Sequence, residues 1–466
     1  MKFVSARRTM SACILSAAGV AAMALPSGAS AAPERCSGAP SIGGQGSSLQ
    51  KVAQEKIWIP AFTKGSNKLA CAGAKGQGAL KKVEVAYNPS GSGAGLRSWG
   101  AESKSPSEIV FGVTNAFVGT DEPPNEAQVK EIENQESTPT PETLETIPVA
   151  QEAVAIIVDL PEVGGVHCTA TSTSAPGRLV ISDQELEEIY AGKIKTWGGI
   201  SGGGDELKPA TCDSATITPV VRFDQSGTTH IFKRYLNLIE PAALETSAGP
   251  KTWSQLSEGS LNTTWPTAAG VIRPGAKGGG ELIKTVTEAP GRIGYVNVAE
   301  AREHAAFVPP AGGDGTSTFW LKLENSSKGS GSKIKMTYAD PASNEESGTA
   351  AESNCGKTAY TNGENPFPPP AVTEYWNEVT TSVPGPGEVK EKGYSLCGLT
   401  YDLAFTKYSL LASQGATEAE ATSVENYLTF VTSKKAGDTE LKNDDYSPLP
   451  KSVLTIAEKG AAKVAF

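Results

Sequence analysis

The sequence has few histidines, no closely spaced cysteines and no long apolar run after its N-terminus. The three histidines, His167, His230 and His304, are scattered, which disfavours a metal site or a general base built on them. None of the seven cysteines belongs to a C-x-x-C motif, so neither a redox dithiol nor a zinc ribbon is indicated. No later segment reaches the ~18 uninterrupted apolar residues of a membrane-spanning helix.

Basic residues are also too few for a nucleic-acid-binding surface. Lys and Arg number 41 against 51 Asp and Glu, a net charge of −10, whereas binding to a phosphate backbone needs a basic footprint. We therefore expect no nucleic-acid partner, although a local site can still bind a small anion. The 50 glycines and 31 prolines argue against a helical bundle, and 38% hydrophobic residues suffice for a packed core.

The first 32 residues have the three regions of a cleaved export signal. Lys2 and the Arg7-Arg8 pair form a positive start, Ile14 to Leu25 an apolar stretch, and Ala29 to Ala31 a small-residue cleavage site. We expect this segment to be removed and the mature protein to be periplasmic or extracellular, without a lipid anchor. Removal of the three basic side chains takes the net charge from −10 to −13. The choice between the Sec and twin-arginine pathways stays open.

Six cysteines remain after Cys13, and an even number in an exported chain indicates disulfides. Six cysteines allow 15 connectivities. We interpret them as pairing in sequence order: Cys36–Cys71, Cys168–Cys212 and Cys355–Cys397. Buried free thiols are the alternative.

Strands and helices alternate through the middle of the chain, which predicts an α/β fold with mostly parallel sheets flanked by helices. The helix at 182–191 has a capping box, Ser182 with Glu185, and a stop at Gly192. Residues 121–147 look like a solvated loop, and residues 301–395 like a Gly-, Ser- and Pro-rich insertion. The apolar patterns predict strands at 82–87, 148–160, 217–221 and 293–298, and further helices at 228–239, 281–287, 416–433 and 450–466.

Three Gly- and Ser-rich segments lie next to predicted helices and could bind an anion. The first, 44–48, precedes a helix that begins near Leu49, and the second, 90–95, follows a strand and precedes another helix. Small residues let the backbone approach a ligand, and N–H groups at a helix start attract an oxyanion. Either segment alone is also typical of an ordinary flexible turn.

The third segment, at 222–229, carries the sharpest signal. Arg222 can direct two N–H groups onto an oxyanion, and Asp224 can orient its guanidinium. Ser226, Gly227 and Thr228 would add hydroxyl and backbone donors at the start of the next helix. A capped helix with a surface Arg–Asp pair explains the motif equally well.

No catalytic motif accompanies these segments. The loop at 90–95 is neither a dinucleotide-binding motif nor a nucleophile elbow. Gly356-Lys357-Thr358 lacks the upstream glycine of a phosphate loop, because Ala351 stands there. Paired carboxylates and metal-ligand spacings do not stand out either. We therefore predict a binding protein that is not an enzyme and has no cofactor.

Taken in order, segments across the mature chain resemble the phosphate-binding proteins of ABC uptake systems. The resemblance implies a two-lobed fold in which the chain crosses between the lobes twice. It implies inorganic phosphate as the ligand, ABC permease subunits as partners, and a monomer. The segments are GGQGSS at 43–48, YNPSGSGAGL at 87–96, FGVTN at 111–115, IPVAQEAVAIIVDLP at 147–161, ISDQELEEIYAGKIKTWGGI at 181–200, ITPVVRFDQSGTT at 217–229, APGRIGYVNVAEA at 289–301 and DYSPLPKSVL at 445–454.

The resemblance also implies which residues belong to each lobe and to the binding site. Lobe 1 would comprise residues 33–150 and 396–466 and lobe 2 residues 151–300, with the insertion at 301–395 packed on the lobes. The expected ligand contacts are Ser48 and Leu49 in the first loop, Ser92 in the second, and Arg222, Ser226, Gly227 and Thr228 in the third, with Asp224 orienting Arg222.

Asn115 is the departure from the family's pattern. It stands where the family's FGxSD motif has an aspartate that accepts the proton of hydrogen phosphate. A neutral amide can donate or accept, so the protein would reject sulfate-like anions less well, or its ligand would have changed. On this interpretation, Asn115→Asp should sharpen the selection of phosphate over sulfate.

Two other functions stay open at this point. The same fold could bind another oxyanion, or the protein could be a secreted surface or interaction protein that has lost transport function. A secreted hydrolase of phosphate esters would need a nucleophile with a base or a metal cluster, and the sequence indicates neither.

Overall fold

The structure is a computed structural model of the 466-residue chain. The predicted export signal and the predicted Cys36–Cys71 disulfide lie outside the residues that it describes. Those residues are 41–64, 83–171, 179–200, 206–273, 277–304, 307, 317–328, 335–343, 352–355, 360–361, 367–381 and 393–466.

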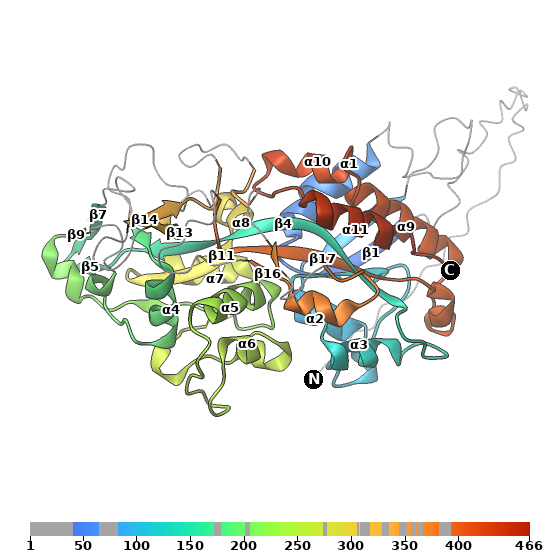
Figure 1. The fold of residues 1–466 in the computed structure, drawn as a ribbon, viewed down its shortest axis with the longest axis horizontal. Helices are drawn as coiled ribbons and strands as arrows, with labels where there is room; N and C mark the ends of the chain where they lie inside the picture. The colour runs from blue at the N-terminus through green and yellow to red at the C-terminus, as the bar shows by residue number, and fades with distance from the viewer. Residues whose placement is uncertain are drawn as a thin grey trace, which may run out of the picture.

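One eight-stranded sheet runs through the molecule, in the order β10-β11-β4-β17-β3-β1-β2, with β12 also paired to β4. The long strands β4 and β17 lie along the long axis (Figure 1). They join one half of the molecule, which contains β1, β2 and β3, to the other half, which contains β10 and β11. β4 pairs with β17 from Leu144 to Ala153 and with β11 from Val154 to Asp159. The strands are β1 (Ser41–Gly46), β2 (Glu84–Asn88), β3 (Phe117–Thr120), β4 (Leu144–Asp159), β10 (Thr218–Pro219), β11 (Arg292–Asn297), β12 (Thr318–Trp320) and β17 (Cys397–Phe405).

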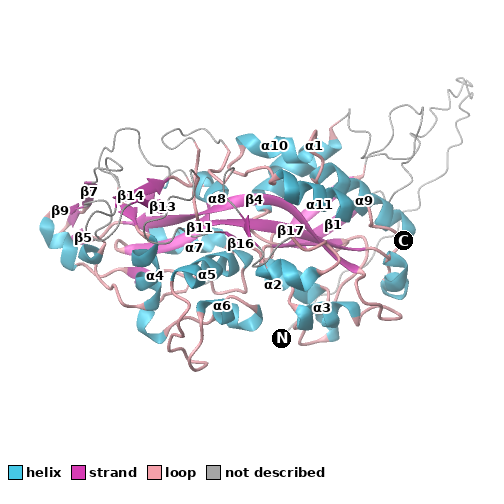
Figure 2. Cartoon of the chain, in the orientation of Figure 1, coloured by secondary structure: helices cyan, strands magenta, loops and turns pink. Residues whose placement is uncertain are grey.

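Parallel strand pairs lie toward the two ends of this sheet. β1 is parallel to β2 and β3, and β10 is parallel to β11. The central strands β4 and β17 are antiparallel to each other and to their neighbours. Helices lie on both sides of the sheet (Figure 2). The predicted α/β fold, with parallel strands flanked by helices, is confirmed.

Helix α4 begins and ends where local chemistry predicts. In α4 the Ser182 hydroxyl accepts from the Glu185 N–H at 3.2 Å, and Gly192 ends the helix in the left-handed conformation, with φ 78°. The helices are η1 (Ala53–Trp58), α1 (Ile59–Thr63), α2 (Ser92–Ser98), α3 (Glu126–Glu133), α4 (Asp183–Ala191), α5 (Gly227–Ile239), α6 (Trp253–Leu256), α7 (Gly279–Thr287), α8 (Val298–Glu303), α9 (Glu418–Val431), α10 (Gly437–Glu440) and α11 (Lys451–Ala461).

The prediction of a solvated loop at 121–147 is wrong. The segment contains helix α3 and the start of β4. Asn125 and Gln128 form a capping box that starts α3, and Ile132 is buried on its inner face. The many Glu, Pro and Thr residues concealed these signals, and they also concealed the burial of Asp121 at the start of the segment.

The described part of the insertion is paired with the main body. β12 adds to β4, and β13 (Lys322–Lys328) pairs with both β14 (Lys335–Ala339) and β8 (Val180–Ile181). The Cys355–Cys397 disulfide ties the insertion to the start of β17, and Cys168–Cys212 closes a loop in the other half, so both of these predicted disulfides are confirmed. The remaining short strands are β5 (Glu162–Val163), β6 (Val166–His167), β7 (Thr169–Thr171), β9 (Glu206–Lys208), β15 (Tyr360–Thr361) and β16 (Thr380–Thr381).

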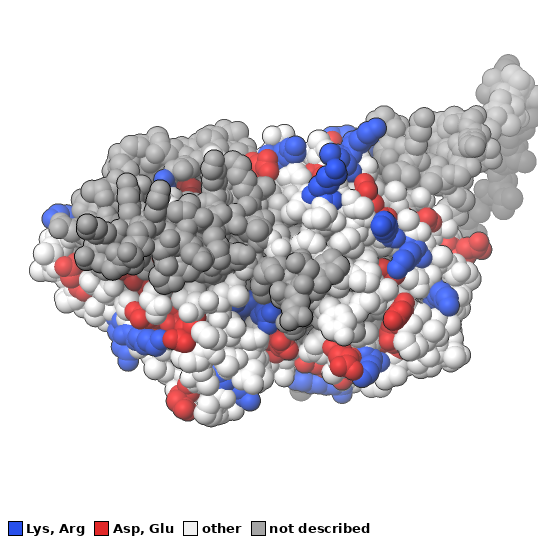
Figure 3. All heavy atoms as spheres, viewed as in Figure 1, with Lys and Arg blue, Asp and Glu red and all other residues white. Residues whose placement is uncertain are grey.

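The surface and the helices carry two further observations. Basic and acidic side chains are interspersed over the face seen in Figure 3, without a large patch of one sign among the described residues. In the described ranges, no helix combines the length and the apolar character needed to cross a membrane. The predicted boundary between the lobes, at 150/151, falls inside β4, and the division into lobes stays a prediction.

Candidate anion-binding site

Three parallel strands end at one edge of the sheet, and each is followed by a polar side chain. Ser47 and Ser48 follow β1, Ser92 follows β2 at the start of α2, and Asp121 follows β3. Because the carboxyl ends of parallel strands lie at the same edge, these side chains meet. The Ser47 hydroxyl donates to Asp121 Oδ1 at 2.5 Å, and the Ser92 hydroxyl donates to Asp121 Oδ2 at 3.4 Å.

Asp121 is the acceptor at the centre of this group. The Thr400 hydroxyl, from strand β17, donates to its Oδ1 at 2.7 Å, and only 2% of the residue is exposed. Burial raises the pKa of Asp121 to about 6, although the hydrogen bonds from Ser47 and Thr400 act in the opposite direction. Sequence reasoning missed this residue, although its position directly after a strand was a usable signal.

Arg222 approaches the same group from the other half of the molecule. Its Nε donates to Asp224 Oδ1 at 2.8 Å, and its Nη2 donates to Oδ2 at 2.5 Å. Its Nη1 donates to the Ser48 hydroxyl at 3.2 Å, across the two halves. Burial opposes ionisation of Asp224, but the adjacent Arg222 charge outweighs it and lowers the pKa of that carboxyl. Arg222 and Asp224 are therefore a buried ion pair, and not a pair on the surface.

Helix α5 directs its first residues at Ser92 and Asp121. The Ser226 hydroxyl caps the helix by accepting from the Thr229 N–H at 3.3 Å. The N–H groups of Gly227 and Thr228 lie in the first turn, where a helix leaves donors without an internal partner. A Cβ placed at Gly227 would lie 2.5 Å from both Asp121 Cβ and Ser92 Oγ, so the backbone itself comes close to them.

Tyr295 fixes the strand-to-helix segment that carries Arg222. Its hydroxyl accepts from the Arg222 N–H at 3.3 Å and shares a hydrogen bond of 2.7 Å with the Thr229 hydroxyl. The tyrosine belongs to β11, which is parallel to β10. The backbone of Arg222 and the start of α5 are thus held against the same strand.

Leu49 and Asn115, two of the residues predicted to contact the ligand, have packing or hydrogen-bond partners within the protein. Leu49 is fully buried in the core, so its side chain contributes packing. The Asn115 amide donates to the Ser98 hydroxyl at 2.9 Å and to the Val110 carbonyl at 2.7 Å. Ser98 is the last residue of helix α2, and Val110 lies in the segment between α2 and β3. The predicted role of Asn115 stays a prediction, and the carboxylate that accepts from the hydroxyls of Ser47, Ser92 and Thr400 belongs to Asp121, six positions later.

The two halves also contact each other on both sides of this group. Glu122 Oε1 accepts from the Gly259 N–H at 2.6 Å, and the Arg97 guanidinium donates to Gln225 Oε1 at 2.9 Å. Burial raises the pKa of Glu122 to about 8. On the opposite side, Lys51 and Lys56 pair with Glu303 at the end of α8.

Several hydrogen-bond donors lie at the meeting point of the halves. Hydroxyls, helix N–H groups and one guanidinium converge there, and Asp121 supplies a carboxylate acceptor. Such a set can satisfy the oxygens of a tetrahedral oxyanion, and the carboxylate can accept from an oxyanion that keeps a proton.

Comparisons with known proteins agree with this architecture. The PBP superfamily domain matches residues 60–369 of this chain. A phosphate-binding protein from an unknown prokaryotic organism is 32% identical over 138 residues, which are 28% of this chain and 34% of that protein. Alkaline phosphatase L of Pseudomonas aeruginosa is 29% identical over 134 residues, 28% of this chain and 32% of its own length. The chain thus spans about a third of the length of these relatives.

A solved structure covers far more of the chain. The high-affinity periplasmic phosphate-binding protein PfluDING, solved with phosphate bound, aligns with 90% of this chain and 93% of its own. The TM-score is 0.54 at 20% sequence identity, which supports the same fold.

Proposed function

Because this chain belongs to the PBP superfamily, we propose that it is an extracytoplasmic binding protein that captures inorganic phosphate between its two halves. The observation that carries the proposal is the buried meeting of Arg222, Asp121 and the first turn of α5. Relatives named as phosphate-binding proteins, and the fold shared with a structure that holds phosphate, support the choice of ligand.

Each group at the meeting point has a role in this proposal. Arg222, oriented by Asp224, supplies charge and two or more N–H donors. Ser48 and Ser92 donate through their hydroxyls, and Gly227 and Thr228 donate through their backbone. A dehydrated oxyanion is costly unless its lone pairs are satisfied, so contributions from both halves favour the closed arrangement.

Asp121 makes the site selective. Hydrogen phosphate carries a proton that a buried carboxylate can accept, whereas fully deprotonated sulfate offers none and would be repelled by the charge. This is the role that the sequence motif assigned to position 115, and the structure supports Asp121 for it. We expect the protein to bind phosphate more tightly than sulfate. The alternative is that its ligand is another oxyanion.

Delivery and location complete the proposal. We propose that the protein is exported, that it acts as a monomer and that it delivers phosphate to the membrane subunits of an ABC permease. The export signal in the sequence and the named relatives support this role. We propose that the anion is held by hydrogen bonds and charge and is not hydrolysed, as in the relatives that are named as phosphate-binding proteins.

Calorimetric titration of the mature protein with phosphate and with sulfate, at neutral and alkaline pH, tests the proposal. We expect tight phosphate binding and little response to sulfate. Comparable sulfate binding would mean a different oxyanion, and heat from neither anion would reject anion capture. Release of p-nitrophenol from p-nitrophenyl phosphate, measured on the same sample, would contradict a pure binding role.

A further inference from the structure

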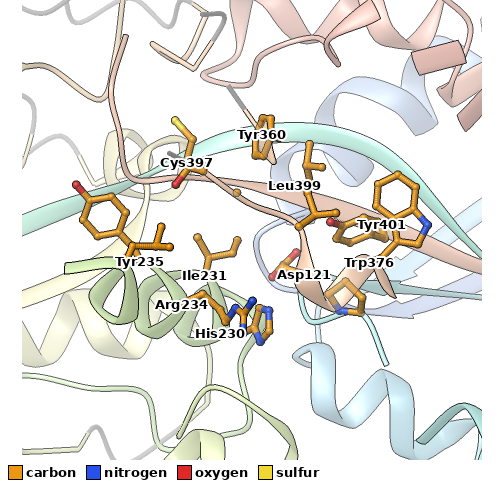
Figure 4. Close-up of a pocket in the computed structure, with 15 residues that line it drawn as sticks. Asp121, His230, Ile231, Arg234, Tyr235, Tyr360, Trp376, Cys397, Leu399 and Tyr401 are labelled. Atoms are coloured by element: carbon orange, nitrogen blue, oxygen red, sulfur yellow. The ribbon is translucent and has the colours of Figure 1, made fainter. Parts of the chain in front are cut away.

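The carboxylate of Asp121 accepts a hydrogen bond from Thr400, a residue of strand β17 and not of the anion-binding loops. Thr400 comes between Leu399 and Tyr401, which line one cavity together with Asp121 (Figure 4). Its hydroxyl lies 2.7 Å from Asp121 Oδ1, and the residue is fully buried. The pairing of β17 with β4 shifts register directly after Thr400, and such irregularities often turn a side chain toward a functional site.

The Thr400 hydroxyl has a single hydrogen, and Gln50 determines which acceptor receives it. Nε2 of Gln50 donates to Thr400 Oγ1 at 2.8 Å, so the threonine oxygen already accepts on that side. The Thr120 carbonyl, a competing acceptor, is 3.4 Å away, against 2.7 Å for Asp121 Oδ1. Because the shorter contact is the stronger hydrogen bond, the Thr400 hydrogen is directed at Asp121.

The Gln50 amide is itself fixed in one orientation. Its Nε2 also donates to the Tyr401 carbonyl at 2.9 Å, and its Oε1 accepts from Gln54 Nε2 at 2.9 Å. A flipped amide would place its oxygen against that carbonyl. Gln54 is oriented in turn by the Tyr427 hydroxyl, which donates to Gln54 Oε1 at 2.5 Å. Burial raises the pKa of Tyr427 well above its ordinary value, so this hydroxyl keeps its proton.

Four side chains thus donate one to the next in a single direction that ends at Asp121. The donors, in order, are Tyr427, Gln54, Gln50 and Thr400, and we call them the donor chain. Each of the four is fully buried. Hydrogen bonds aligned in this way polarise one another, and a hydrogen bond donated to a carboxylate favours its charged form. The donor chain therefore favours an ionised Asp121.

Asp121 titrates close to pH 6, and the groups that surround it in the described part of the chain do not. Burial raises the pKa of Asp121 to about 6, against the hydrogen bonds from Ser47 and Thr400. Arg222 and Arg234 bring positive charges that do not titrate. Burial raises the pKa of the neighbouring carboxyls and tyrosines, to about 8 for Glu122 and Asp402, and lowers that of His230 to about 3. The other members of this set are Glu152, Tyr87, Tyr401 and Tyr446.

We propose that Thr400, oriented by Gln50, is a positioning residue that keeps Asp121 an ionised acceptor and so determines which oxyanion the site selects. An ionised Asp121 accepts from hydrogen phosphate and repels sulfate, whereas a protonated Asp121 donates a hydrogen bond and admits sulfate. The inference rests on the proposed function, because it concerns how the same anion site discriminates between ligands.

The dependence of sulfate affinity on pH tests this role. Sulfate stays deprotonated near neutral pH, so its binding reports the protonation of Asp121. In the parent, sulfate affinity should fall as the pH rises through about 6. Thr400→Val keeps the shape and removes the hydroxyl, so this midpoint should lie about one pH unit higher. The ratio of phosphate to sulfate affinity at pH 7 should fall about tenfold. An unchanged midpoint in folded Thr400→Val would overturn the proposal.

Matched variants separate positioning from packing. Thr400→Ser keeps the hydroxyl and should restore the parent's midpoint and affinity ratio. Thr146→Val is the control, because Thr146 lies in β4 opposite Leu403 of β17, and its buried hydroxyl has no hydrogen-bond partner among the described residues. It should change neither quantity, and a shift equal to that of Thr400→Val would refute the role of the hydroxyl.

Gln50→Met tests the donor chain without changing Thr400. It frees the Thr400 hydroxyl to turn toward the Thr120 carbonyl, so the sulfate midpoint should rise, by less than in Thr400→Val. Circular dichroism establishes that each variant is folded. If Thr400→Val does not fold, an unchanged midpoint in folded Gln50→Met overturns the proposal in its place.

A measurement without any anion separates this inference from the proposed function. The side-chain carboxyl ¹³C resonance of Asp121, identified by its absence in Asp121→Asn, reports the pKa of Asp121 in the phosphate-free protein. We expect that pKa to be higher by about one in Thr400→Val than in the parent. This shift in a protein that binds neither phosphate nor sulfate would refute the proposed function, while the action of Thr400 on Asp121 stands. Phosphate binding with an unchanged pKa and an unchanged anion preference in Thr400→Val would refute the inference alone.

Discussion

Replacing Asp121 with asparagine should make the phosphate-free protein more stable at neutral pH and should weaken phosphate binding. The residue is 2% exposed, and burial raises its pKa from 3.8 to about 6. The folded protein therefore holds the proton more tightly than the unfolded chain does. Ionisation above pH 6 lowers the free energy of unfolding, and this cost disappears below pH 3.8.

The size of the effect follows from these values. A rise of about two pKa units amounts to about 3 kcal/mol of unfolding free energy at pH 7. The amide of asparagine keeps one acceptor for the hydroxyls of Ser47 and Thr400, and we subtract about 1 kcal/mol for the weaker hydrogen bonding. Asp121→Asn should thus be more stable than the parent by about 2 kcal/mol at pH 7 and by almost nothing at pH 4.

Urea unfolding at the two pH values measures the free energy of unfolding, and calorimetry measures the affinities for phosphate and sulfate. Loss of a charged acceptor should weaken phosphate binding by at least about tenfold, while sulfate binds no worse. The matched control is Asn115→Asp, which should leave the phosphate-to-sulfate ratio unchanged because that amide serves Ser98 and Val110. A less stable Asp121→Asn protein at pH 7, or an unchanged anion preference, would refute the reasoning.

Three other substitutions test separate parts of the site. Arg222→Lys loses the two-pronged pairing with Asp224 and should weaken phosphate binding at least about tenfold by calorimetry; parent-like affinity would argue against the guanidinium. Gly227→Ala places a Cβ 2.5 Å from Asp121 and Ser92. We expect its main effect to be weaker phosphate binding, with a smaller effect on the thermal midpoint of unfolding. Glu122→Gln removes a carboxyl whose pKa burial raises from 4.5 to about 8; the parent loses stability as pH rises through that window, so the variant should have the higher midpoint at pH 9 and not at pH 4.5. Equal midpoints at pH 9 would count against burial of Glu122 in the folded state.

Much of the fold could be predicted because local signals and burial agree. The capping box of α4, the run of Val and Ile in β4 and the periodic apolar face of α5 each predict the element that the structure contains. The antiparallel central strands could not be predicted, because β4 and β17 are about 240 residues apart and pair through contacts that no local pattern reports. The same limit applies to the insertion, whose strands join β4 and β8.

The site could be predicted in part for the same reason. The segment from Arg222 to Thr228 is continuous, so its strand, loop and helix cap are visible together in the sequence. Asp121 was missed because it opens a stretch whose composition predicts a solvated loop, and because a similar motif at 111–115 ends in Asn115. Only the end of β3 shows which of the two positions reaches Ser47, Ser92 and Thr400.

A crystal structure of the mature protein with phosphate tests the central claim most directly. The account predicts a phosphate ion within hydrogen-bond distance of Arg222, Ser48, Ser92 and the first N–H groups of α5, with one oxygen facing Asp121. Phosphate bound elsewhere, or a well-ordered crystal grown in saturating phosphate without the ion at this position, would contradict it.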